Sequence, residues 1–238
     1  VLDVLASANT GFRAPNVNDV ASFGVADFRH EVPNYNLNAE KSFQYQAGFR
    51  IHAEKFRAEF VTYQNNLRDL ICNVASTYNG LDSLDGVKVY KKENVNKAVV
   101  KGMEGEVNYQ PVSWLNAFVN MTYTLGENRT RNEPLSRIPP MFGRVGADIK
   151  FRNSFTWRLE LLQAGKQDRL SSGDKQDVRI QQGGTPAWSV VNTRLQYVYR
   201  NFQVNTGVQN IFDKAYRVHG SGVDGIGRSY WLSLIVKI

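Results

Sequence analysis

The chain alternates between apolar and polar residues with a period of two, most clearly near its C-terminal end. In residues 229–238, one face of an extended chain would carry Tyr230, Leu232, Leu234, Val236 and Ile238. The same period describes residues 202–209 and recurs along the whole sequence. Successive side chains of a β-strand point to opposite faces, so this period predicts strands with one face in an apolar medium and the other in a wetter one. A sheet period without a helical period is typical of a membrane β-barrel.

Composition agrees with a sheet protein and argues against a helical membrane protein. The chain has 238 residues, of which 42% are hydrophobic. A transmembrane helix needs about 18 or more consecutive apolar residues, whereas the longest uninterrupted apolar runs here, such as residues 234–236, are far shorter. A water-soluble sheet protein fits this composition, and so does an outer-membrane barrel, because half of each strand then faces a polar lumen.

The formal net charge of +7 comes from basic residues that are scattered rather than clustered. A nucleic-acid partner is therefore not expected, and we expect the excess to line a polar lumen or to meet anionic lipid headgroups. Cys72 is the only cysteine, which excludes an internal disulfide and a cysteine metal cage. The sequence starts at Val1 without a signal peptide, so we expect a mature or truncated segment of an exported protein.

The periodicity predicts about ten antiparallel strands. They cover residues 1–8, 43–52, 56–70, 99–109, 115–123, 144–151, 155–161, 191–199, 202–209 and 229–238. Short connections lie at residues 53–55, 111–114, 152–154 and 200–201. Long connections lie at residues 11–38, 73–85, 126–140, 166–187 and 210–227. Short turns on one side and long loops on the other are the layout of an outer-membrane barrel, with tight periplasmic turns and long extracellular loops.

Charged residues avoid the apolar register in strand after strand. An Arg or Lys facing lipid at the bilayer midplane would cost about 2–4 kcal/mol, so we expect the charges to form an inner, lumen-facing wall. This predicted wall consists of Arg50, Arg57, Glu59, Glu104, Glu106, Arg144, Asp148, Arg158, Glu160 and Arg194. Aromatic residues gather near the short turns, as an interfacial girdle would; they are Tyr109, Trp114, Phe151, Phe155 and Tyr199.

Six short motifs occur in a fixed order along the chain. They are GFRAPN at residues 11–16, NLNAEKS at 36–42, KGMEGE at 101–106, PLSRIPP at 134–140, GVQNIFDKAYR at 207–217 and GRSYW at 227–231. This ordered set resembles the barrel of TonB-dependent outer-membrane receptors. The second motif departs from the family pattern, because Ala39 stands where proline is usual. Each motif alone is weak, but the set covers almost the whole chain.

The resemblance implies the C-terminal part of a transmembrane barrel of about 22 strands, an all-β fold with an N-terminal plug domain closing the lumen. Residues 1–238 would then carry roughly the last ten strands, without the plug and the earlier strands. Such barrels usually end in an aromatic residue, so Ile238 indicates a clipped end or a weakened assembly signal. The implied location is the bacterial outer membrane.

The resemblance also implies a receptor for energy-dependent uptake of a scarce ligand. A ferric siderophore or similar metal chelate is the default by family frequency, with haem, cobalamin or a glycan as alternatives. The implied partners are outer-membrane lipid, the protein's own plug, the TonB energy-transducing complex acting through that plug, and a small extracellular ligand. No resident cofactor or metal is expected.

Six loop residues are candidates for ligand binding. His30 lies where haem receptors of similar pattern carry an iron-ligating histidine, but it could equally be a solvated loop histidine. His219 lies in a glycine-rich segment that could fold over the mouth or be a plain turn. Tyr35 and Tyr78, like Tyr90 and Tyr216, could stack on a ligand or pack the loops. Arg13 and Arg217 could pair with an anionic chelate, or brace loops through carboxylates such as Asp19 or Asp213.

The sequence contains no recognisable catalytic constellation, so an enzyme is not expected. One competing hypothesis is a self-contained barrel hydrolase, in which His30 and His219 would act with Asp27 or Asp224. Another is a soluble β-sandwich binding module, which would need no detergent for extraction.

Overall fold

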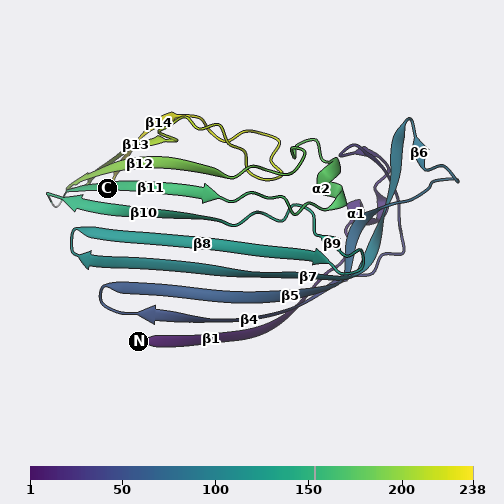
Figure 1. The fold of residues 1–238 in the computed structure, drawn as a ribbon, viewed down its shortest axis with the longest axis horizontal. Helices are drawn as coiled ribbons and strands as arrows, with labels where there is room; N and C mark the ends of the chain where they lie inside the picture. The colour runs from purple at the N-terminus through teal and green to yellow at the C-terminus, as the bar shows by residue number, and fades with distance from the viewer. Residues whose placement is uncertain (153, 238) are drawn as a thin grey trace.

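The computed structural model describes residues 1–152 and 154–237, and shows one curved antiparallel sheet with loops gathered at one end (Figure 1). The sheet strands are β1 (Leu2–Arg13), β4 (Glu40–His52), β5 (Phe56–Ala75), β7 (Val87–Val112), β8 (Leu115–Asn128), β10 (Phe142–Phe151), β11 (Phe155–Ala164), β12 (Trp188–Tyr199), β13 (Phe202–Gln209) and β14 (Ser229–Val236). The connections contain β2 (Gly24–Ala26), β3 (Arg29–Val32), β6 (Ser83–Leu84), β9 (Glu133–Pro134), α1 (Val17–Ala21) and α2 (Ser172–Gln176).

The ten long strands pair in sequence order, each antiparallel to the next. Short turns join them at one end and long connections at the other, as predicted. β1 and β14 lie at the two edges of this sheet, and no pairing joins them within the described residues. No helix in the described part of the chain is long and apolar enough to cross a membrane.

The apolar residues fall into continuous rows across neighbouring strands, because the register of every hairpin keeps them on one face. Val4, Phe49 and Phe60 are direct neighbours across three strands. Leu195 likewise lies opposite Trp157, which lies opposite Ile149. Large apolar side chains on this face are exposed; they include Phe43, Val119, Leu159 and Leu234. The predicted placement of the apolar residues on one face is confirmed, and no layer of described residues covers that face.

The predicted wall residues share the opposite face, because each lies in the alternate register of its strand. Arg50 donates from Nε and Nη2 to the two carboxylate oxygens of Glu59, at 2.8 and 3.0 Å. Phe118 is only 9% exposed, and the guanidinium groups of Arg144 and Arg158 lie 5.7 and 4.9 Å from the centre of its ring. This face is therefore polar and carries paired charges.

The aromatic residues near the short turns stack on one another. Phe151 and Phe155 lie parallel with ring centres 5.3 Å apart, and Phe155 lies 4.6 Å from Tyr197. Phe56 meets Tyr109 edge-on at 6.3 Å. These pairs form part of the girdle expected at a membrane boundary, where aromatic rings combine apolar bodies with polar edges.

Several strands are longer than predicted at the loop end. β1 continues to Arg13, where a strand ending at residue 8 was predicted, and β5 continues to Ala75. β7 begins at Val87 instead of residue 99. The ladder hydrogen bonds of the β5–β7 hairpin continue to Ala75 and Tyr90 although the apolar period has ended. The predicted end of the last strand at Ile238, and Asn153 in a short turn, lie outside the described residues.

Candidate functional site

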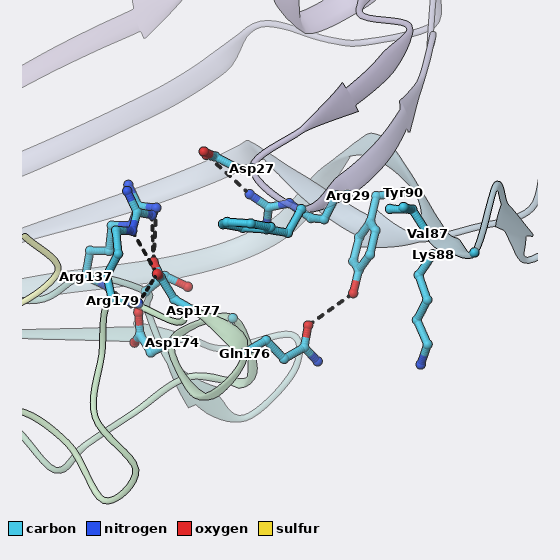
Figure 2. Close-up of a pocket in the computed structure, with 14 residues that line it drawn as sticks. Asp27, Arg29, Val87, Lys88, Tyr90, Arg137, Asp174, Gln176, Asp177 and Arg179 are labelled. Atoms are coloured by element: carbon cyan, nitrogen blue, oxygen red, sulfur yellow. Dashed lines mark hydrogen bonds and ion pairs between the residues drawn. The ribbon is translucent and has the colours of Figure 1, made fainter. Parts of the chain in front are cut away.

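A cavity of about 510 Å³ opens at the loop end of the sheet. It is lined by residues from the β2–β3 hairpin, the start of β7, the connection after β9, and α2 with the residues that follow it (Figure 2). The cavity therefore gathers four segments that are far apart in sequence. The charged and aromatic residues lining it are Asp27, Phe28, Arg29, Lys88, Tyr90, Arg137, Asp174, Asp177 and Arg179.

The short helix α2 is fixed at its first turn and holds one side of the cavity. Ser171 accepts a hydrogen bond from the Asp174 backbone N–H, and Asp174 accepts one from the Ser171 backbone N–H, which forms a capping box. Asp174 is only 2% exposed and also accepts a hydrogen bond from the backbone N–H of Arg137. The hydroxyls of Ser136 and Ser171 lie 2.7 Å apart. The connection between β8 and β10 is thus locked to α2.

Asp177 joins two arginines at the same place. Arg179 donates from Nε to Oδ1 at 2.8 Å and from Nη2 to Oδ2 at 2.7 Å. Arg137 donates from Nη2 to Oδ2 at 3.3 Å. The hydrogen bonds from Arg179, together with the positive charges of Arg179 and Arg137, lower the pKa of Asp177 to about 2. Asp177 is therefore ionised at neutral pH and holds both guanidinium groups at the cavity wall.

The opposite wall combines an arginine, a tyrosine and a lysine. The Arg29 guanidinium lies 5.8 Å from the ring centre of Tyr90 and 3.7 Å from the Asp27 carboxylate. The Tyr90 hydroxyl donates to Gln176 Oε1 at 3.2 Å, which links β7 to α2. In Figure 2 the Lys88 side chain extends away from Asp177 and its two arginine partners, Arg137 and Arg179. Among the ion pairs found between described residues, none involves Lys88.

The lining therefore presents four cations and three carboxylates, and one of those carboxylates, Asp174, is buried in the helix cap. Guanidinium and ammonium groups bind negatively charged oxygens, and the face of Tyr90 can stack on an aromatic ring. The arrangement suits a small anionic ligand with aromatic groups. No group of three or more His, Cys, Asp or Glu residues in the described parts of the chain is arranged to hold a metal ion.

His30 and Tyr78 do not line this cavity, and both lie beside the ring of Phe23. His30 is in β3, opposite Val89 of β7, and is 8% exposed, so the alternative of a solvated loop histidine is wrong. Both of its ring nitrogens are buried without a hydrogen-bond partner among the described residues. The ring of Phe23 contacts both side chains, with ring centres 5.6 Å from His30 and 5.5 Å from Tyr78.

Arg13 and Arg217 each form ion pairs with carboxylates of this chain, which link the segments that carry them. Arg13 bonds Asp19 and Glu40, each at 2.6 Å, and these hydrogen bonds raise the arginine's pKa. Arg217 bonds Asp224 at 2.7 Å instead of Asp213, the partner considered from the sequence. Asp213 accepts the backbone N–H of Arg228.

His219 and Tyr35 have contrasting surroundings. His219 Nδ1 lies 2.8 Å from the Thr185 hydroxyl, which links the last loop to the α2 connection, and burial lowers the pKa of His219. Asp224, one of the two carboxylates considered for hydrolysis, is paired with Arg217. Tyr35 is 75% exposed. None of the six predicted ligand-binding residues lines the cavity, and of the four tyrosines considered only Tyr90 does.

Comparisons with known proteins identify relatives of the chain. A family model described as "TonB dependent receptor-like, beta-barrel" matches residues 2–211. The ferrienterobactin receptor of Escherichia coli is 28% identical over 76% of this chain and 24% of its own length. The heme/hemopexin utilization protein C of Haemophilus influenzae strain 86-028NP is 25% identical over 98% of this chain and 35% of its own length. The chain thus spans about a quarter to a third of these relatives.

Solved structures match the fold over nearly the whole chain. The copper transporter OprC superimposes with a TM-score of 0.81 at 19% identity, covering 99% of this chain and 37% of its own. The ferric enterobactin receptor PfeA mutant Q482A of Pseudomonas aeruginosa, in complex with enterobactin, superimposes with a TM-score of 0.77 at 21% identity, covering 99% of this chain and 38% of its own. At these identities the likeness concerns the fold.

Proposed function

This chain belongs to the TonB-dependent receptor β-barrel family, and on that premise we propose that it is the part of an outer-membrane receptor that captures a ferric siderophore for energy-dependent uptake. The family is one of receptors and transporters located in the outer membrane, which argues against the self-contained barrel hydrolase and the soluble β-sandwich. The ferrienterobactin receptor of E. coli is among the relatives. The proposal concerns the whole receptor, of which this chain is one part.

The observation that carries the proposal is the cationic cavity at the loop end. A ferric catecholate chelate is a compact anion with aromatic rings, and the lining offers the complementary groups. Lys88 and Arg29 supply positive charge, and Tyr90 supplies an aromatic face beside them. Long-range attraction by such groups raises the local concentration of an anionic ligand. We propose that Asp177 fixes the positions of the Arg137 and Arg179 side chains. Both guanidinium groups would then add to the electrostatic attraction of an anionic ligand without moving to contact it directly.

Transport beyond the cavity would use the polar face of the sheet. In our proposal this face lines the lumen, contacts the plug, and is exposed to ligand when the TonB complex acts on that plug. The predicted wall contains five arginines and five carboxylates, and two of these arginines are paired directly, Arg50 with Glu59 and Arg158 with Asp148. A balanced wall would let an anion pass without trapping it, whereas the unbalanced cavity above would concentrate it.

Haem is a weaker candidate because of the surroundings of His30. An axial ligand must present a ring nitrogen to iron at an accessible position, and both nitrogens of His30 are covered. Because a heme/hemopexin utilization protein is among the relatives, haem binding should be measured alongside siderophore binding.

The test is ligand binding by the full-length receptor that contains this chain. We expect a ferric catecholate siderophore to bind, and Lys88→Ala and Arg29→Ala each to weaken binding roughly tenfold, a loss of about 1.4 kcal/mol. Lys55→Ala, in a short turn at the other end of the sheet, is the matched control and should bind as the parent does. Haem binding that depends on His30, without siderophore binding, would overturn the assignment, as would siderophore binding indifferent to both cavity substitutions.

A further inference from the structure

The connection between β13 and β14 runs toward α2 (Figure 1) and contains a loop, residues 216–225, that is closed by its own bonds. At its base the backbone N–H of Gly225 donates to the carbonyl oxygen of Tyr216 at 2.8 Å. Above the base, Arg217 Nε donates to Asp224 Oδ1 at 2.7 Å. The 216–225 loop is therefore a compact unit with its own internal contacts.

Among the hydrogen bonds between described residues, only one joins the 216–225 loop to another segment. It links His219 Nδ1 to the hydroxyl of Thr185, which lies in the connection after α2, at 2.8 Å. Thr185 is only 7% exposed, and its backbone exchanges two hydrogen bonds with Gln167, each at 3.0 Å. The loop is thus attached by one polar contact to a neighbour that is itself held firmly.

The backbone of the 216–225 loop lies against two arginines that line the cavity. A Cβ added at Gly220 would be 3.7 Å from Arg137 Cγ, and one added at Gly222 would be 3.6 Å from Arg179 Cδ. The loop therefore covers the aliphatic parts of both side chains, whose guanidinium groups bind Asp177. The position of the loop and the structure of the cavity wall are coupled through these contacts.

The surroundings of His219 suit a neutral imidazole. Its second ring nitrogen, Nε2, is buried without a hydrogen-bond partner among the described residues. A protonated imidazole donates from both nitrogens, so here it would leave a charged N–H without an acceptor, which is costly. Burial lowers the pKa of His219 below its ordinary value of 6.5, and the charges of Asp174 and Asp177 oppose this shift only in part.

The carboxylates around His219 already have partners. Asp174 accepts backbone N–H groups in the cap of α2 and from Arg137, while Asp177 and Asp224 are paired with arginines. On the segment that pairs with Thr185, Asp168 lies 3.3 Å from Lys166. A protonated His219 would therefore have to compete for an acceptor. The charged residues on the segments packed around His219, apart from Lys166 and Asp168, are Arg137, Asp174, Asp177, Arg179, Arg217 and Asp224.

We propose that His219 is an acid-sensitive attachment point, which holds the 216–225 loop against the cavity arginines while it is neutral and releases the loop when it is protonated. The stability that the neutral form gives to the docked loop is complete above pH 6.5 and is lost as the pH falls through the lower pKa of the docked form. Asp177, with a pKa of about 2, stays ionised in this window. The cavity arginines thus keep their partner while their aliphatic parts become uncovered.

The experiment measures the distance between the loop and the segment after α2 in the full-length receptor without ligand, so its outcome does not depend on the proposed uptake function. Nitroxide labels are placed at Val223→Cys and Val178→Cys, which are 74% and 75% exposed, in a cysteine-free background that includes Cys72→Ser. Double electron–electron resonance should give one narrow distance distribution at about pH 8. A second, broad population should appear below pH 6.5, and its ratio to the docked population should rise by at most about tenfold per pH unit, the limit for one proton.

Variants separate this contact from a general effect of acid. His219→Gln keeps a hydrogen-bonding group but cannot be protonated in this range, so its distribution should stay narrow. His52→Gln, the same change at the short-turn end of β4, is the matched control and should keep the transition of the parent. Thr185→Val removes the partner hydroxyl and should show the broad population already at about pH 8. A transition that persists in His219→Gln, or a parent distribution that is unchanged down to about pH 5, would overturn the proposal.

Discussion

Arg158 of β11 forms a bidentate salt bridge with Asp148, its direct neighbour on β10. Arg158 Nε donates to Asp148 Oδ1 at 2.6 Å, and Arg158 Nη2 donates to Asp148 Oδ2 at 2.7 Å. The Asp148 side chain is 13% exposed. Cross-strand contacts of this kind fix the register of a hairpin as well as its stability.

Replacing Asp148 by Asn should lower the free energy of unfolding by about 1–3 kcal/mol, because a partly buried guanidinium loses a charged partner. The measurement is the unfolding midpoint of the full-length receptor in detergent. The double variant Asp148→Asn, Arg158→Met should lose less than the sum of the single variants, since each removes the same contact. Additive losses would contradict a specific pair.

The two faces of β12 should respond oppositely to a new charge. Leu195 lies in the outward apolar row and Gln196 lies on the polar face, bonded to Asn205 at 3.1 Å. Leu195→Arg should destabilise the barrel in a bilayer by about 2–4 kcal/mol, the cost of Arg near the midplane. Gln196→Arg should cost much less, because its side chain faces the wet side. Equal costs in bilayer-reconstituted receptor would refute the assignment of faces.

Glycine should be required at position 207 but not at 105. A Cβ at Gly207 would lie 2.6 Å from the backbone oxygen of Thr193 and 2.9 Å from the Trp231 ring, whereas a Cβ at Gly105 would meet nothing closer than 3.8 Å. Gly207→Ala should therefore cost about 1–3 kcal/mol through overpacking. Gly105→Ala should leave the unfolding midpoint nearly unchanged. Both variants can be compared by thermal melting, and similar midpoints would show that β12 and β13 have room to separate.

The ion pairs of Asp177, which follows α2, with Arg137 and Arg179 should be lost at low pH. The pKa of Asp177 is about 2 in the folded chain, below its ordinary value of 3.8, so its ionisation contributes stability that is complete above that ordinary value. This contribution declines as the pH falls from about 4 to about 2. The protection factors of the amides of residues 171–180, in which the intrinsic pH dependence of exchange is divided out, should fall over this window. In Asp177→Asn this fall should be absent, because the protection is already low at neutral pH.

Much of the barrel wall could be predicted from the sequence, because membrane contact imposes a strict period on the outward residues. Residues 202–209 match β13 at both ends. The period ends where the membrane ends, so the polar extension of β7 from Val87 carries no such signal. The same reason explains why the β2–β3 hairpin, which pairs with that extension, was not predicted.

The candidate site was harder to predict than the wall. Arg29, Lys88, Arg137 and Arg179 come from four separate segments, and nothing local distinguishes them from other loop cations. Their convergence depends on contacts between loops, such as Arg137 with Asp174 and Tyr90 with Gln176. By contrast, the brace between Arg13 and Asp19 was among the alternatives considered, because the two residues are close in sequence.

The length of β7 determines how far the cavity lies from the apolar part of the sheet. The strand continues from Lys97 to Val87 for about 30 Å more, and its far end carries Lys88 and Tyr90 into the cavity. The hairpin formed by β5 and β7 therefore places the cavity well beyond the last row of the outward apolar face.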